Sequence, residues 1–266
     1  TVVFGQSIKE DIMIRNQSIK IQLVLFFSLM LLLITACKGN NPSGVDISDR
    51  LDWRTSNIMT SVKNQDIPGS AGTCWAFASV GMLEAVIKKD HQISLDLAEQ
   101  HLINTVPTQG PIEGVAYLQS NGVLTESEVP YTGRPNPAFV LNKKPKHGVR
   151  DHELIILTTL SSADRIIKIK DTVRRYGPLL VSMTLYSDLD AYSNGIYSYN
   201  GHAPEQAGHI VLIVGWDYDQ NQRLYWICKN SWGESWGLQG YFNIYPEEAE
   251  IGTQYAICIK EAYVNP

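Results

Sequence analysis

The chain has 266 residues, of which 44% are hydrophobic and 18% charged. This balance is typical of a globular protein with a sizeable core, in one large domain or two lobes. The net charge of −5, with both signs scattered and no low-complexity tract or internal repeat, argues against a nucleic-acid-binding protein.

The N-terminal part of the chain has the features of an export signal. Residues 1–12 precede Met13, and we interpret them as a mis-called start. After Met13 a basic segment leads into the apolar run IQLVLFFSLMLLLITA. A spanning helix needs about 20 apolar residues, so this run is more typical of a secretory signal.

The end of the apolar run, LITAC, resembles a bacterial lipobox. The resemblance implies that residues 13–37 are a lipoprotein signal, cleaved before Cys37, and that the Cys37 sulfur carries a lipid. An uncleaved membrane anchor is the alternative. Either way, we expect the rest of the chain to work outside the cytoplasm, tethered to a bacterial membrane.

Residues 38–50, KGNNPSGVDISDR, are polar and contain glycine and proline. They predict a flexible tether, and the folded domain is expected to span residues 51–266.

Three cysteines follow Cys37. Cys228 and Cys258 lie in the strand-like segments LYWICKN and YAICIK. We expect both to be small buried apolar side chains, with a single disulfide as the alternative. The domain is long enough to fold without disulfides. Cys74 is then left without an evident structural partner.

A loop containing proline and glycine precedes Cys74, and apolar residues then recur at intervals of three and four: Trp75, Ala78, Met82 and Val86. This spacing predicts a helix from Cys74 to Lys89 with one buried face. Cys74 would lie in its first turn, where free N–H groups and the helix dipole stabilise an anion and lower the thiol pKa. A thiolate is a nucleophile, although an inert buried cysteine is the alternative.

The later segments favour helices first and strands afterwards. Helices are expected at residues 94–106, with Ser94 as a cap, and at residues 111–122. Beyond about residue 150, one helix at residues 162–177 interrupts a series of predicted strands: 152–160, 178–185, 209–218, 224–230, 240–245 and 256–264. The pattern predicts an α+β protein with a helical lobe at about 51–150 and a β-rich lobe at about 151–266.

A thiolate nucleophile needs a base, and the base needs an orienting group. Five histidines lie in polar or loop-like contexts, whereas His209 opens an apolar strand after Gly208. Asn230 ends another apolar strand and is followed by Trp232. A core histidine and a turn-capping asparagine remain the alternatives at this point.

Six segments, in order along residues 51–266, resemble the papain family of cysteine peptidases: DWR, VKNQ, GTCWAFA, GHIVLIVGW, KNSWGESWG and GYFNI. The resemblance implies a two-lobed papain-like fold, with a helical N-terminal lobe, a barrel-like β-rich C-terminal lobe and an active-site cleft between them. It also implies a cysteine peptidase, by default an endopeptidase, that acts on peptides or proteins. We expect a monomer that uses no metal or cofactor.

The resemblance also implies roles for individual residues. Cys74 would attack the scissile carbonyl, and His209 would pair with it and protonate the leaving amine. Asn230 would fix the imidazole ring, with Trp232 shielding that hydrogen bond from water. Gln65 and the Cys74 backbone N–H would form the oxyanion hole.

Substrate-binding positions are implied less directly. Gly72, Gly208 and Trp232 flank the catalytic residues, and Gly110 would pair with an extended substrate. Lys260, placed by counting back from the end of the chain, would close the pocket for the second residue before the scissile bond and favour an acidic or polar side chain there. A surface lysine is the alternative.

The sequence also departs from the family pattern. The loop from Gln65 to Cys74 is longer than usual, and Ala71 replaces a cysteine that is usually disulfide-bonded. Only residues 38–50 separate Cys37 from LDWR, so we expect an enzyme that is not made as a conventional zymogen. The rival functions are a Cys–His acyl transferase or amidase, and a binding or adhesion lipoprotein on an inactive peptidase scaffold. The second rival usually loses a catalytic residue, and none is missing here.

Overall fold

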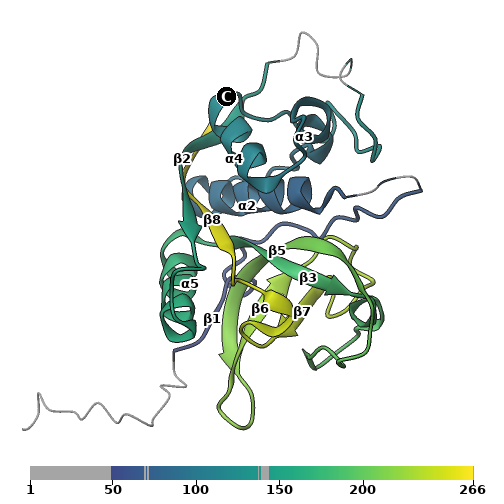
Figure 1. Cartoon of the computed structure of the whole chain (residues 1–266). Helices are drawn as coiled ribbons and strands as arrows, with labels where there is room; N and C mark the ends of the chain where they lie inside the picture. Colours follow the sequence, from purple (N-terminus) through teal and green to yellow (C-terminus); the bar gives the residue numbers. More distant parts are fainter. Residues whose placement is uncertain (1–48, 69, 71, 137, 139–143, 266) are drawn as a thin grey trace, which may run out of the picture. The chain divides into compact units, whose positions relative to one another are not determined.

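The structure is a computed structural model that describes residues 49–265 except 69, 71, 137 and 139–143 (Figure 1). The predicted signal sequence, Cys37 and nearly all of the tether lie outside the described residues. The elements, in chain order, are β1 (Leu51–Asp52), α2 (Cys74–His91), α3 (Glu99–Thr105), α4 (Pro111–Ser120), β2 (His147–Ile156), α5 (Ser162–Tyr176), β3 (Leu179–Tyr186), η2 (Ser187–Ala191), β4 (Ile196–Tyr197), β5 (Glu205–Tyr218), β6 (Leu224–Lys229), β7 (Tyr241–Ile244), η3 (Glu248–Glu250) and β8 (Tyr255–Val264).

The described strands form an eight-stranded sheet in the order β2-β8-β3-β5-β6-β7-β4, with β1 added alongside β5. Strand β5 is central, because it pairs antiparallel with β3, β6 and β1. Figure 1 shows α2, α3 and α4 grouped at one end of the molecule and strands β3, β5, β6 and β7 at the other. This arrangement confirms the expected α+β, two-lobed fold.

Strand β5 contributes to the two larger hydrophobic cores of the described residues, because successive side chains of a strand point to opposite faces. Leu212 and Val214 pack in the core that also contains Trp75 and Leu83 of α2. Val211 and Ile213 pack in the second core, with Val173 of α5 and other large side chains: Trp216, Trp226 and Phe242. The continuous apolar run of β5 is therefore explained by burial on both faces.

Helix α3 begins at Glu99, so the prediction of a helix from Ser94 is wrong. The backbone N–H of Leu97 donates to the Glu84 carboxylate at 2.8 Å, and its carbonyl accepts from Lys63 Nζ at 2.7 Å. Leu97 also forms a β-bridge with Thr125. These partners, distant in sequence, hold the segment before α3 extended.

Several other boundaries also differ from the predictions by a few residues; strand β5, for example, begins at Glu205 rather than at residue 209. Strand β2 begins at His147 rather than at residue 152. Helix α5 is capped by Ser161, whose side chain accepts a hydrogen bond from the Asp164 N–H, and it ends before Gly177. The predicted helix at residues 74–89 is confirmed, extending to His91.

Cys74, Cys228 and Cys258 are free and buried. The prediction that Cys228 and Cys258 are small apolar core residues is confirmed, and the alternative of a disulfide is wrong. Across the described part of the chain, no helix combines the length and apolar character needed to cross a membrane.

Candidate active site

Cys74 and His209 line one open pocket of about 420 Å³, which we call the Cys74 pocket. The helical lobe contributes the start of α2 and the segment before it, and the β-rich lobe contributes β3, β5 and the segment after β6. The full lining is Gln65, Asp66, Gly72, Cys74, Leu185, Asp190, Gln206, Ala207, Gly208, His209, Trp232 and Trp236.

Cys74 is the first residue of α2 and is 8% exposed. Burial raises the pKa of its thiol, while hydrogen bonds from the backbone N–H groups of Ile210, Trp75 and Cys74 itself lower it. The net direction is upward, so the expectation of a lowered pKa is wrong for the thiol by itself. The cost of burying a charge exceeds the effect of the helix N-terminus.

His209 is buried, and its Nε2 lies 2.8 Å from Asn230 Oδ1. The same Oδ1 accepts the backbone N–H of Ser231 at 2.9 Å. Because a backbone N–H can only donate, the atom facing His209 is the amide oxygen, and Nε2 must carry a proton. Nδ1 is then the nitrogen left to act as a base. Burial lowers the pKa of His209, and the bond to Asn230 opposes this shift.

Trp232 covers the histidine. Its ring centroid lies 5.2 Å from that of His209 at an interplanar angle of 31°. Trp236 packs edge-on against Trp232 at 4.9 Å. Trp232 thus packs against the His209 ring, and its shielding of the His209–Asn230 bond from water remains a prediction.

Gln65 is 8% exposed, and a hydrogen bond holds the oxygen of its side-chain amide. Its Oε1 accepts the Ser231 hydroxyl at 2.6 Å, and its backbone N–H donates to the Ser231 carbonyl at 2.8 Å. The remaining polar group of the side chain is the NH₂ donor. Gln65 is thus tied to the segment that follows Asn230.

The structure brings most of the predicted site residues together. Gln65, Gly72, Cys74, Gly208, His209 and Trp232 line the Cys74 pocket, and Asn230 lies behind His209. Gly110 lies outside it, at the N-cap of α4, and its pairing with a substrate remains a prediction. Lys260 is not brought to the pocket either. Its Nζ pairs with Glu153 at 3.2 Å and Asp151 at 3.8 Å on β2, as expected for a surface lysine.

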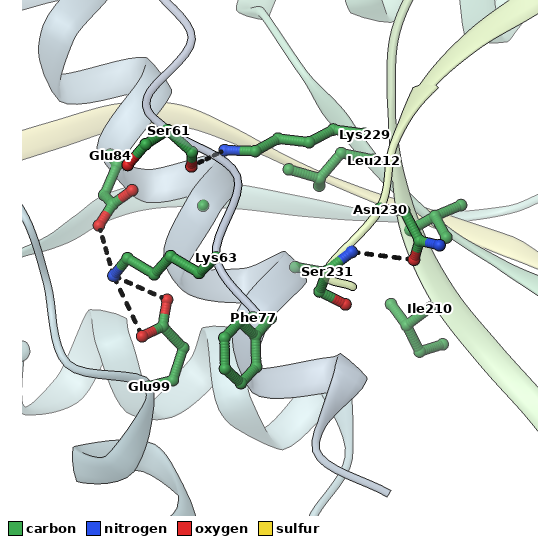
Figure 2. Close-up of a pocket in the computed structure, with 13 residues that line it drawn as sticks. Ser61, Lys63, Phe77, Glu84, Glu99, Ile210, Leu212, Lys229, Asn230 and Ser231 are labelled. Carbon is green, nitrogen blue, oxygen red and sulfur yellow. Dashed lines mark hydrogen bonds and ion pairs between the residues drawn. The ribbon is translucent and has the colours of Figure 1, made fainter. Parts of the chain in front are cut away.

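A second, smaller cavity of about 20 Å³ lies behind the site and contains buried charges (Figure 2). Lys63 Nζ lies 3.2 Å from Glu84 and 3.0 Å from Glu99. Lys229, the residue before Asn230, donates to the carbonyls of Thr60 and Ser61 at 3.0 and 2.9 Å. Burial lowers the pKa of Lys229 to about 8. These contacts fix the end of β6 to the segment that leads to Gln65.

Sequence patterns did not reveal two residues near the site, Ser231 and Asp190. Ser231 lies inside the motif KNSWGESWG, but nothing local shows that its hydroxyl reaches Gln65, 166 residues away. Asp190 lines the pocket from η2, in a segment without a recognised pattern.

A family model described as "Papain family cysteine protease" matches residues 47–261. The chain belongs to this family. Among curated proteins, it is 32% identical over 206 residues to pro-cathepsin H of Mus musculus, covering 73% of this chain and 59% of the mouse protein. It is 36% identical over 201 residues to the viral cathepsin of Antheraea pernyi nuclear polyhedrosis virus, covering 73% and 58%. The chain thus spans less than two thirds of the length of these relatives.

Solved structures support the fold. The bromelain protease of Ananas comosus in complex with the E64 inhibitor aligns with a TM-score of 0.66 at 21% identity, covering 80% of this chain and 98% of that one. Digestive procathepsin L2 of Tenebrio molitor aligns with a TM-score of 0.65 at 28% identity, covering 82% and 70%. The prediction of a papain-like fold is confirmed.

Proposed function

We propose that the chain is a cysteine peptidase in which Cys74 is the nucleophile, His209 the acid–base group and Asn230 the residue that orients the imidazole. The observation that carries the proposal is the buried His209–Asn230 bond of 2.8 Å at the pocket that Cys74 lines. Membership of the papain family supports the same chemistry.

Burial acts on the two reactive groups in opposite directions, raising the pKa of Cys74 and lowering that of His209. Each shift favours the neutral form of the group. A thiolate and an imidazolium about 4 Å apart gain about 4 kcal/mol from their attraction at an effective dielectric constant of about 20. That equals about 3 pKa units, so at such a separation the two groups would be charged as a pair although burial favours neither charge alone.

In the proposed reaction, the Cys74 thiolate attacks the peptide carbonyl and forms a tetrahedral intermediate. The Gln65 NH₂ and the Cys74 backbone N–H stabilise its oxyanion. The His209 imidazolium then gives its Nδ1 proton to the departing amine. Water hydrolyses the thioester, with the neutral imidazole accepting its proton.

The proposed substrates are peptides or proteins bound in an extended form, because the pocket is open at the surface and both lobes line it. Endopeptidase activity by a monomer is the proposed default. The lipobox-like sequence LITAC supports export and lipid anchoring at Cys37 to a bacterial membrane. Mass spectrometry of the N-terminal peptide tests the anchor, since a diacylglyceryl group on Cys37 is expected and an unmodified Cys37 would contradict it.

The activity is tested by treating the purified protein with a peptidyl epoxide and with fluorogenic peptides. We expect covalent labelling of Cys74 and peptide cleavage, both lost in Cys74→Ala. Cys258→Ala is a control, because Cys258 is a free buried cysteine away from the pocket. Labelling without cleavage would instead favour a binding protein or a different acyl acceptor, and the absence of both would refute the proposal.

A further inference from the structure

The backbone carbonyl of Gln65 accepts hydrogen bonds from a nearby serine of its own loop and from a tyrosine distant in sequence. The Tyr131 hydroxyl donates to it at 2.8 Å, and the Ser70 hydroxyl at 2.7 Å. On the opposite side, the Gln65 N–H donates to the Ser231 carbonyl. Both polar backbone groups of Gln65 are therefore occupied.

The Tyr131 hydroxyl also lies 2.9 Å from Thr73 Oγ1. A tyrosine hydroxyl has one proton, and a carbonyl oxygen can only accept. Since that proton goes to the Gln65 carbonyl, the Thr73 hydroxyl must donate to Tyr131. A directed chain of bonds thus runs from Thr73 through Tyr131 to Gln65. We call it the Tyr131 bridge.

The tyrosine ring is itself held in place. It packs edge-on against Phe77 of α2, with ring centroids 4.9 Å apart and an interplanar angle of 89°. The Tyr131 backbone N–H donates to the Glu126 carboxylate at 2.7 Å. Burial raises the pKa of the Tyr131 hydroxyl, so it remains a donor at neutral pH.

Both ends of the Tyr131 bridge adjoin the proposed oxyanion hole. Gln65 supplies one proposed donor, and Thr73 is the N-cap residue of α2, directly before the Cys74 N–H that supplies the other. The described cysteines are free, so no disulfide among them fixes the loop between these residues. The bridge spans that loop.

We propose that Tyr131 is a positioning residue for the oxyanion hole, which sets the Gln65 side chain relative to the Cys74 N–H through its hydroxyl. The inference rests on the proposed peptidase function. Tyr131 is not among the residues that line the Cys74 pocket; it acts through Gln65 and Thr73.

Tyr131→Phe is the primary test, because it keeps the ring against Phe77 and removes both bonds. Loss of one oxyanion-hole donor typically lowers kcat by about 10²–10³, and misplacement should cost less than loss. We therefore expect kcat on a fluorogenic peptide to fall about tenfold with little change in KM. The rate at which iodoacetamide alkylates Cys74, and its pH profile, should not change, because alkylation needs the thiolate and no oxyanion.

Tyr117→Phe is the matched control. It removes the hydroxyl of another half-buried tyrosine of the helical lobe, 3.4 Å from His101 and outside the Cys74 pocket. Its kcat should equal that of the wild type. Gln65→Ala provides the coupling test: if Tyr131 acts through Gln65, adding Tyr131→Phe to Gln65→Ala should lower kcat by less than twofold further.

The outcomes separate the two proposals. A wild type that neither cleaves peptides nor labels at Cys74 refutes the peptidase function. An active wild type with unchanged kcat in Tyr131→Phe overturns only the Tyr131 inference, as does a fully multiplicative loss in the double variant. If Tyr131→Phe fails to fold, Thr73→Val removes one bond of the bridge and should show a smaller loss of kcat with the same dependence on Gln65. An unchanged kcat in Thr73→Val would then overturn the inference.

Discussion

Asn230→Ala removes the acceptor that fixes the His209 ring. In the structure, Asn230 Oδ1 accepts from His209 Nε2 at 2.8 Å and from the Ser231 N–H at 2.9 Å, and all three residues are buried. A buried donor left without a partner costs about 1–3 kcal/mol. In the variant, His209 Nε2 is the donor left without its partner. If this free-energy cost falls on the transition state, in which the imidazolium must keep its orientation, kcat/KM falls by about 5- to 150-fold.

The assay is steady-state cleavage of a fluorogenic peptide, together with urea unfolding to show that the variant is folded. Asn243→Ala is the matched control, since it truncates an asparagine on β7 whose side chain donates only a long bond, 3.3 Å, to the Gly195 carbonyl outside the pocket. It should retain full activity. A folded Asn230→Ala protein with kcat/KM within twofold of the wild type would refute the proposed role of Asn230.

Three further variants test the electrostatics of the site. Gln65→Ala should lower kcat by about 10²–10³ while leaving Cys74 alkylation unchanged; equal losses in both assays would show that Gln65 acts on the thiol. Asp190→Asn should lower the pKa of His209, because the Asp190 charge raises it; NMR titration of the imidazole measures this, and an upward shift would contradict the assigned charge effect. The pKa of Lys229 is lowered from 10.5 to about 8, so the unfolded state binds more protons between these values and the free energy of unfolding rises with pH there, by about 3 kcal/mol. Lys229→Met should remove this rise in a comparison of urea unfolding at pH 7 and pH 10, and an identical pH dependence in both proteins would show that burial does not perturb Lys229.

The sequence predicted the features that depend on local patterns. Apolar spacing placed Cys74 in the first turn of α2, and the apolar run of β5 placed His209 on a buried strand. These predictions succeeded because side-chain periodicity follows directly from helix and strand geometry. The order of the motifs then identified the family, and with it the two-lobed fold.

Features set by distant partners could not be predicted. The start of α3 depends on the contact of Leu97 with Glu84, and the position of Lys260 depends on the register of β8 against β2. Tyr131 reaches Gln65 across 66 residues. The direction of the Cys74 pKa shift follows from burial by the whole fold, which the helix position alone does not reveal.

The most direct measurement of the central claim is the pH dependence of Cys74 alkylation in the wild type and in His209→Ala. If Cys74 and His209 ionise as a pair, the wild-type thiol should react well below the pKa of a free cysteine, about 8.5. In His209→Ala, reactivity should appear only above that value, because burial then raises the thiol pKa without an opposing charge. Superimposable profiles for the two proteins would contradict the pairing.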